Sequence, residues 1–275
     1  MKNLSALIFT DLDGTFLDNN NFSFGRNFNI AQNLIDLGHF VIFNSSKTFV
    51  EIDKLFNSHQ IKFPIICETG GGIYIPYELS DDHEPFNNSY NTIYEAIKIS
   101  VIKDQITDIC NDFKDEMKFF NDLIHDDKIK LSGLDSDGVI LASQRVFSTL
   151  FIWSSSEARL MELSNILKKI NIRIIKGARF FHLCSNFDKG TAMQKTINKF
   201  KDIYADRDFV TVALGDSSND YEMLKIADYP CVVKSPGNKN LHYSALPEKT
   251  IFSSISAPNG WSECIEKVLG KLGAS

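Results

Sequence analysis

The chain has 275 residues, of which 43% are hydrophobic and 23% charged, which suits one large or two modest globular domains. Its formal charge of −6 argues against nucleic acid as a partner, because a phosphate backbone calls for a basic surface. The five cysteines have no paired spacing and fit reduced, buried thiols. Neither a signal peptide nor an apolar run of roughly 20 residues is visible. We therefore expect a cytoplasmic protein with no membrane or nucleic-acid partner.

The first part of the chain alternates between strand-like and helix-like patterns. Apolar runs at residues 4–10, 39–43 and 63–67 have the length of buried strands. Residues 27–37 and 48–58, which lie between them, read as helices. Strands that alternate with helices of this length need parallel crossover connections, so this region predicts a doubly wound sheet.

The pattern changes after about residue 75. Residues 77–90 are rich in Asp, Asn, Pro and Ser, as expected of a linker. The segment that follows mixes helix-like and strand-like patterns without strict alternation, which is typical of an α+β domain. In it we expect helices at residues 92–119, 137–145 and 157–169, and strands at 149–153, 172–176 and 179–184.

The alternation resumes near residue 189, with two further helix–strand pairs and a closing helix at 261–269. We therefore predict an α/β protein whose core is a doubly wound parallel sheet (Rossmann-like), formed by residues 1–81 and 186–275. An α+β cap domain is expected to be inserted at residues 82–185. In such a sheet, ligands bind beyond the carboxyl ends of the strands. The resumed elements are expected at 189–200 and 220–226 for the helices, and at 209–214 and 231–233 for the strands.

Two carboxylates follow the first strand, in the segment Asp11-Leu12-Asp13-Gly14-Thr15. Asp11 and Asp13 can face one pocket across a turn that Gly14 permits. One carboxylate can then attack a phosphorus atom while the other gives and takes a proton. A plain Asp-Gly turn is the alternative interpretation of this segment.

A second acidic loop, residues 215–220 (GDSSND), follows the strand expected at 209–214. The Asp216 carboxylate can complete an oxygen-rich magnesium site with Asp11, because both loops are expected at the same edge of one sheet. We expect Asn219 and Asp220 to orient the metal shell. Taken alone, the segment also fits a simple loop and helix N-cap.

Two further segments indicate an anion site. Residues 44–48 (NSSKT) follow the second strand and open a helix, where hydroxyl groups, backbone amides and the helix N-terminus suit a phosphoryl group. A Ser N-cap is the alternative. Lys189 opens the helix after the expected insertion, although a lone Lys is more often a solvated surface residue. We predict phosphate binding by Ser45, Ser46 and Lys189.

These four segments, in this order, resemble the four motifs of the haloacid dehalogenase-like superfamily, and the resemblance covers the whole chain. It implies that Asp11 is the nucleophile and Asp13 the acid/base. It further implies that Ser45 and Lys189 contact the phosphate. Mg²⁺ would be held by Asp11, Asp216 and the backbone carbonyl of Asp13. The place of the insertion resembles the second cap type, found among sugar-phosphate phosphatases.

A narrower resemblance, to the mannosyl-3-phosphoglycerate phosphatase family, rests on four short segments. It implies a small phosphorylated sugar or glycerate substrate, either mannosyl-3-phosphoglycerate or glucosyl-3-phosphoglycerate. The sequence departs from the family pattern at Thr69, where Asn is usual, and at Ala178, where Gly is usual. The segments are 45–48 (SSKT), 68–76 (ETGGGIYIP), 177–182 (GARFFH) and 258–261 (PNGW).

Cationic side chains are the candidates for contact with such a substrate. The planar guanidinium of an Arg matches a glycerate carboxylate. We predict substrate binding by Lys47, Arg145, Arg179 and His182. Surface ion pairs, or for His182 a packed position in a strand, are the alternatives.

Other functions fit the same motifs. Sucrose phosphate or a hexose phosphate is an alternative substrate, and a sugar phosphomutase would use the same phospho-aspartate while protecting it from water. A non-catalytic phosphosugar-binding module is the alternative outside enzymes, but it would not need both Asp11 and Asp13. The sequence leaves the oligomeric state open.

Overall fold

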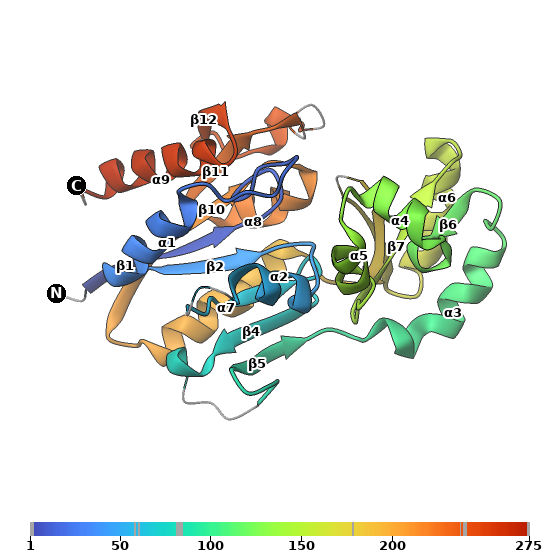
Figure 1. The fold of residues 1–275 in the computed structure, drawn as a ribbon, viewed down its shortest axis with the longest axis horizontal. Helices are drawn as coiled ribbons and strands as arrows, with labels where there is room; N and C mark the ends of the chain where they lie inside the picture. The colour runs from blue at the N-terminus through green and yellow to red at the C-terminus, as the bar shows by residue number, and fades with distance from the viewer. Residues whose placement is uncertain are drawn as a thin grey trace.

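The computed structural model describes residues 3–57, 59, 61–80, 85–177, 179–236, 238 and 241–273 of the 275-residue chain. Two bodies, each built on its own sheet, lie side by side (Figure 1). The larger body holds both termini, and the smaller one is formed by the middle of the chain, in green and yellow. Within the described residues, no helix is long and apolar enough to cross a membrane.

The larger sheet is mostly parallel. Its strands, in spatial order, are β12 (Ile251–Ser256), β11 (Tyr229–Lys234), β10 (Arg207–Gly215), β1 (Asn3–Thr10), β2 (Phe40–Asn44), β3 (Ile65–Cys67), β4 (Gly72–Pro76) and β5 (Tyr90–Glu95). The pairs from β12 to β3 are parallel, and β4 and β5 extend the sheet as antiparallel strands.

Helices cover both faces of this sheet. Successive side chains of a strand point to opposite faces, so Ile8 and Leu7 of β1 belong to two different hydrophobic clusters. The cluster around Ile8 includes side chains of α1 (Asn27–Asp36), α2 (Phe49–Phe56) and α9 (Asn259–Leu272). The cluster around Leu7 includes side chains of α7 (Lys189–Ile203) and α8 (Tyr221–Ile226). The sheet is thus doubly wound, and the predicted fold class is confirmed.

The smaller sheet is antiparallel and has helices on both faces. Its strands, in spatial order, are β6 (Met117–Phe119), β7 (Ser148–Trp153), β9 (Phe181–Ser185) and β8 (Ile172–Lys176). On one face, α3 (Ile99–Asn111) and α6 (Glu157–Lys168) pack around Phe151. On the other, α4 (His125–Ser132) and α5 (Ser136–Ala142) pack around Leu150. The described chain also has 3-10 helices: η1 (Tyr77–Leu79), η2 (Phe120–Asp122), η3 (Ser218–Asp220) and η5 (Tyr243–Ala245).

The order of the strands brings the two acidic loops together. The chain runs outward from β1 through β2 to β3, and later returns to the other side of β1 as β10. Since β1 and β10 pair in parallel, with Thr10 opposite Leu214, the residues after both strands leave the same edge of the sheet. This reversal of strand order is the place where open α/β sheets bind ligands.

The region between residues 77 and 119 differs from the prediction. Residues 92–119 are not one helical stretch, because the chain forms β5, then α3, then β6. Tyr90, Thr92 and Tyr94 in β5 are residues that favour strands, and their pairing with β4 overrides the helical pattern. Strands β4 and β12 and helix α4 were also missed.

The predicted domain boundary, between residues 81 and 82, lies outside the described residues. Because β5 pairs with β4, the larger sheet extends past this point. We propose that the cap begins after β5 and ends with β9, whose last residue is Ser185. The chain would then cross between the bodies at residues 96–98 and 186–188.

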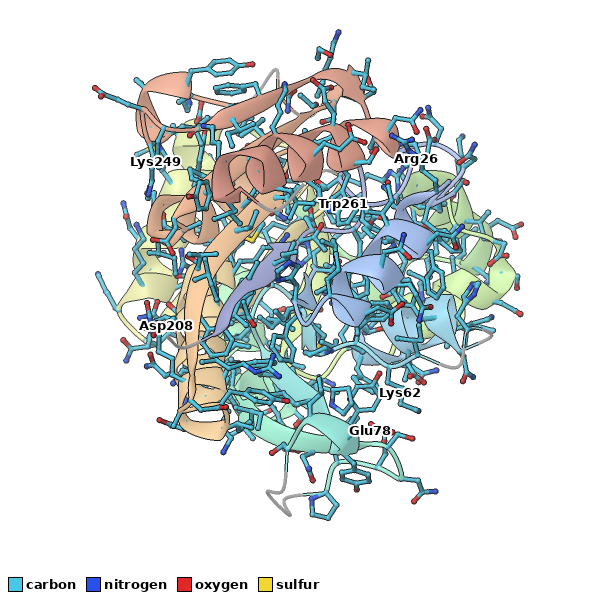
Figure 2. All side chains as sticks on the ribbon, turned by 90° about the vertical axis from the view of Figure 1, so that its left-hand side faces the viewer. Arg26, Lys62, Glu78, Asp208, Lys249 and Trp261 are labelled. Atoms are coloured by element: carbon cyan, nitrogen blue, oxygen red, sulfur yellow. The ribbon has the colours of Figure 1, made fainter. Side chains whose placement is uncertain are left out.

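A buried hydrogen bond joins the closing helix to the central strand. Trp261, at the start of α9 (Figure 2), is fully buried, and its ring meets that of Phe16 edge-on at 5.0 Å. The indole N–H donates to Thr10 Oγ1 at 3.0 Å, and the Thr10 hydroxyl donates to the Asp11 carbonyl at 2.8 Å. This contact fixes the end of β1, where the acidic loop begins.

We predict that Thr10→Val lowers the free energy of unfolding by about 1–3 kcal/mol, because the Trp261 N–H would stay buried without an acceptor. Val has nearly the shape of Thr, so the packing should be kept. Urea unfolding of the wild type, Thr10→Val and Thr10→Ser measures the effect. Thr10→Ser retains the acceptor and should lose less. Equal stability of the Val variant and the wild type would contradict the prediction.

Candidate active site

A buried ammonium lies between two carboxylates at the carboxyl edge of the larger sheet. Lys189 Nζ is 2.8 Å from Asp11 Oδ1 and 2.6 Å from Asp220 Oδ1. All three side chains are buried. Burial alone would lower the pKa of Lys189, but Asp11 and Asp220 outweigh it and raise that pKa above its usual value. Lys189 is therefore charged, and it draws the start of α7 to the end of β1.

Asp220 orders the second acidic loop. Its Oδ1 accepts from Lys189, and its Oδ2 accepts from the backbone N–H groups of Asp216 and Ser217, both at 3.0 Å. The nearby Ser217 hydroxyl donates to Asn219 Oδ1 at 2.6 Å. Both oxygens of Asp220 are thus engaged, which fits a residue that orients its neighbours.

Three buried carboxylates meet here. Asp11, Asp216 and Asp220 each place an oxygen within 4.8 Å of the others. Burial raises the pKa of Asp11 to about 7; Lys189 opposes this shift, and Asp220 and Asp13 add to it. The pKa of Asp216 is also raised well above its usual value, first by burial and then by Asp220 and Asp11.

The carboxylate cluster fits a divalent cation. The ammonium of Lys189 offsets only part of the negative charge of the three Asp side chains, and carboxylate oxygens are the ligands that Mg²⁺ prefers. Asp13 Oδ1 is buried and finds no hydrogen-bond partner among the described residues, so an acceptor oxygen is left unsatisfied there as well. Asp11 and Asp216 could supply carboxylate ligands, while Asp220 is held by its own donors.

The surroundings of Asp216 leave little free space. Its Oδ2 accepts from the Ser235 hydroxyl, and its backbone carbonyl accepts from Asn238 Nδ2 at 2.8 Å. Gly14 has a φ of 75°, and a Cβ there would lie 2.7 Å from Asp216 Oδ2, so only glycine fits. Sequence reasoning missed Ser235 and Asn238. They follow β11, the strand next to β10, and that position was the available signal.

Asp13 lies beside the largely buried ammonium of Lys47. Its Oδ2 is 3.0 Å from Lys47 Nζ, which is also 4.0 Å from Glu51 Oε1. Burial would lower the pKa of Lys47, yet Asp13 and Glu51 outweigh it and raise that pKa. The structure therefore brings the predicted substrate residue Lys47 to the predicted acid/base residue.

The loop after β2 is held by its backbone. Ser45 is buried, its N–H donates to the carbonyl of Ile66 at 2.9 Å, and its Oγ accepts from the Lys47 N–H at 3.2 Å. Ser46 is half-buried, and its carbonyl accepts from Arg145 Nη2 at 2.6 Å. The predicted phosphate loop thus lies beside β3 and contacts the smaller body.

Glu68 is a buried anchor that sequence reasoning did not identify as a site residue. It follows β3 with a φ of 48°, and its N–H donates to the Lys47 carbonyl at 2.8 Å. Its carboxylate accepts from the N–H groups of Val146, Phe147 and Ser148 at 2.8–3.1 Å. The Ser148 hydroxyl donates to it at 2.7 Å. Glu68 therefore ties the predicted phosphate loop to the start of β7.

Arg145 takes part in the same network. Its Nε lies 3.7 Å from Glu68 Oε2 and donates to Ser148 Oγ at 2.9 Å, while its Nη2 donates to Ser46. The side chain is nearly buried. Because Nε and Nη2 already donate to groups of the protein, fewer N–H donors of Arg145 are left for a substrate. A substrate role for Arg145 stays a prediction.

Arg179 and His182 differ in their exposure to solvent. Arg179 is exposed, and its guanidinium carbon is 5.7 Å from the ring centre of Phe22 in the larger body. His182 in β9 is buried, and its Nδ1 has no hydrogen-bond partner in the part of the chain that the structure describes. Burial lowers the pKa of His182 well below its usual value, and Arg145 and Lys189 lower it further, so the imidazole is neutral.

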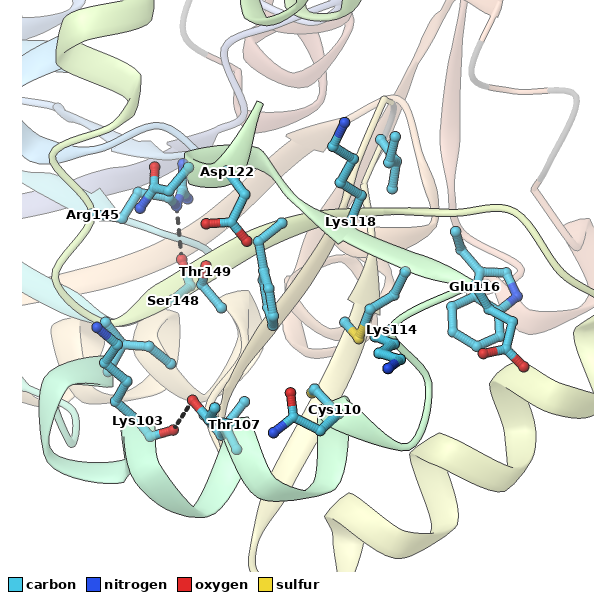
Figure 3. Close-up of a pocket in the computed structure, with 18 of the residues that line it drawn as sticks. Lys103, Thr107, Cys110, Lys114, Glu116, Lys118, Asp122, Arg145, Ser148 and Thr149 are labelled. Atoms are coloured by element: carbon cyan, nitrogen blue, oxygen red, sulfur yellow. Dashed lines mark hydrogen bonds between the residues drawn. The ribbon is translucent and has the colours of Figure 1, made fainter. Parts of the chain in front are cut away.

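A large cavity lies elsewhere, in the smaller body. Its volume is about 890 Å³, and it lies between α3 and strands β6 and β7 (Figure 3). Arg145 and Ser148 stand at one end, joined by their hydrogen bond, and Asp11, Asp216 and Asp220 are not among the residues that line it. The carboxyl edge of the larger sheet, not this cavity, carries the predicted chemistry.

The chain is similar to known hydrolases. A model of haloacid dehalogenase-like hydrolases matches residues 8–243. A glucosyl-3-phosphoglycerate/mannosyl-3-phosphoglycerate phosphatase from Methanococcoides burtonii is 30% identical, over 98% of this chain and 98% of that one. An enzyme of the same name from Persephonella marina is 31% identical, over 97% of this chain and 98% of that one.

The fold is shared more widely. A sucrose-phosphatase from Synechocystis, solved with sucrose and phosphate, is 15% identical, with a TM-score of 0.63 over 98% of each chain. This likeness shows the fold alone. The fold and the full-length relatives identify a phosphoric monoester hydrolase, so the predicted enzyme class is confirmed. The chain belongs to the haloacid dehalogenase-like hydrolase family.

We predict that Glu68→Gln lowers the free energy of unfolding by about 1.5–3 kcal/mol, because hydrogen bonds to a buried charge are lost and Arg145 loses its carboxylate. Glu116→Gln is the matched control: Glu116 pairs with Arg159 on the outside of the smaller body, and its loss should be much smaller. Urea unfolding of both variants measures the difference. Equal losses would mean that Glu68 is not an anchor.

Proposed function

We propose that the chain is a magnesium-dependent phosphatase that hydrolyses glucosyl-3-phosphoglycerate or mannosyl-3-phosphoglycerate through a phospho-aspartate on Asp11. The observation that carries the mechanism is the contact of Lys189 with both Asp11 and Asp220 beside Asp216. Two relatives that bear both substrates in their name, at 30% and 31% identity, support the substrate.

In the first step, an Asp11 oxygen forms a bond to phosphorus as the bond from phosphorus to the glycerate oxygen breaks. Asp13, in its protonated form, gives its proton to that leaving oxygen. Lys189, 2.8 Å from Asp11, offsets negative charge at the nucleophile and at the phosphoryl group. The Ser45 hydroxyl and the loop amides would orient the phosphoryl oxygens.

In the second step, Asp13 takes a proton from water, whose oxygen attacks phosphorus and frees the Asp11 carboxylate together with inorganic phosphate. Asp11, Asp216 and the carbonyl of Asp13 would hold Mg²⁺, which when bound offsets charge on the phosphoryl oxygens. Asp220 and Asn219 would keep the Asp216 loop in place. The smaller body would act as a cap that excludes bulk water.

We predict that Asp11→Asn lowers kcat by several orders of magnitude without unfolding the protein, because the covalent nucleophile is lost. Phosphate release and circular dichroism measure the two effects. Asp104→Asn, an exposed change on α3, is the control and should behave as the wild type. Substantial turnover by pure Asp11→Asn would contradict the mechanism.

We predict that Mg²⁺ raises the melting temperature of the wild type but not that of Asp216→Ala, since a ligand that binds the folded state stabilises it. A chelator should abolish activity, and added Mg²⁺ should restore it only in the wild type. Thermal unfolding with and without Mg²⁺ gives a readout that does not depend on turnover. An equal shift in both proteins would place the metal elsewhere.

The substrate is tested by phosphate release from glucosyl-3-phosphoglycerate, mannosyl-3-phosphoglycerate, sucrose phosphate and hexose phosphates. We expect kcat/KM to be highest for the first two, because both relatives carry those names. A higher value for sucrose phosphate or a hexose phosphate would overturn the substrate and keep the mechanism. Transfer of phosphate between sugar positions would favour a mutase.

A further inference from the structure

Phe22 has a backbone conformation that bulky residues seldom adopt. Its φ of 57° lies in the left-handed region. Its loop is closed by hydrogen bonds: Asp18 N–H donates to the Ser23 carbonyl at 2.8 Å, and Phe22 N–H donates to the Asp18 carbonyl at 3.1 Å. Asp18 Oδ1 also accepts from the N–H groups of Asn20 and Asn21. The loop thus imposes an unfavourable conformation on an aromatic residue.

The ring of Phe22 contacts cations and is absent from the hydrophobic clusters of the described residues. Lys47 Nζ lies 5.1 Å, and the Arg179 guanidinium 5.7 Å, from its ring centre. Two residues later, Phe24 packs against the aromatic ring of Phe28, as a core residue should. Strain on a residue that the core does not use points to function.

These contacts join the acid/base carboxylate to the smaller body. Asp13 pairs with Lys47. The side chains of Lys47 and of Arg179, which precedes β9, both contact the ring of Phe22. Arg179 forms no ion pair within the described part of the chain. A guanidinium that rests on an aromatic ring keeps its N–H donors, which lie in its own plane, free for an anion.

We propose that Phe22 is a positioning residue, which holds the guanidinium of Arg179 over the active site for a carboxylate of the substrate. The inference rests on the proposed function, since the glycerate part of the substrate carries a carboxylate away from the phosphoryl group. The role of Phe22 would be indirect, through Arg179. An aromatic side chain at this position then sets the preference for a phosphate ester with a second negative charge.

The test compares kcat/KM for mannosyl-3-phosphoglycerate with kcat/KM for an aryl phosphate, which has no carboxylate. In Phe22→Leu the ratio should fall about threefold to thirtyfold, as expected from the loss of cation–π contacts, mainly through KM. Phe22→Tyr keeps an aromatic face and should restore the ratio. An unchanged ratio in Phe22→Leu, or an equal fall in Phe22→Tyr, would overturn the proposal.

The melting temperatures of variants distinguish a positioning role of Phe22 from a packing role. Phe22→Asn should keep or raise the melting temperature, because Asn tolerates the left-handed region, while the ratio of kcat/KM values falls. Phe24→Leu is the control: it should lower the melting temperature and leave the ratio within about twofold. If Phe22→Asn lowers the melting temperature as much as Phe24→Leu and spares the ratio, Phe22 is a packing residue.

A double-mutant cycle tests the contact without substrate. Phe22→Leu, Arg179→Ala and the double variant are unfolded in urea. The double variant should lose less free energy of unfolding than the sum of the losses of the two single variants, since either change alone removes the same contact. Strict additivity would overturn the inference. If the wild type instead hydrolyses aryl phosphate but neither glycosyl-3-phosphoglycerate, the substrate proposal fails, and the cycle still decides the role of Phe22.

Discussion

The candidate active site depends on the burial of one ammonium between two carboxylates. Without Lys189, the side chains of Asp11 and Asp220 would face each other in a place closed to water, where like charges repel strongly. Lys189 relieves that repulsion only in part; burial first, and the neighbouring carboxylates after it, raise the pKa values of Asp11 and Asp216. The excess negative charge explains why this edge of the sheet suits a divalent cation and a phosphoryl group.

The sequence predicted this part of the molecule because its signals are local. Asp11, Asp216 and Ser45 each come directly after an apolar strand, and parallel strands end at one edge of a sheet. The reversal of strand order at β1 and β10 then decides that the two acidic loops are neighbours. Lys189 could be predicted because it lies at the start of the first helix after the insertion. Sheet topology thus converted short patterns into a three-dimensional site.

The sequence could not predict contacts made by side chains far apart. Glu68 accepts hydrogen bonds from amides about 80 positions later, and no local pattern distinguishes it from a turn residue. Phe22 resembles any loop aromatic until its φ and its two cations are known. The helix predicted for residues 92–119 was wrong for a related reason, since pairing with β4, a contact between separate segments, makes β5 a strand.

Two of the contacts between the bodies, at Glu68 and at Phe22, differ in strength, and this has a consequence for access to the site. Glu68 is buried and fully hydrogen-bonded, so separating it from residues 146–148 would break all of these hydrogen bonds to its carboxylate at once. The contact of Phe22 with Arg179 involves an exposed guanidinium, which water can solvate when the contact opens. Of these two contacts, the one at Phe22 therefore costs less to open when substrate enters, and the one at Glu68 holds more firmly.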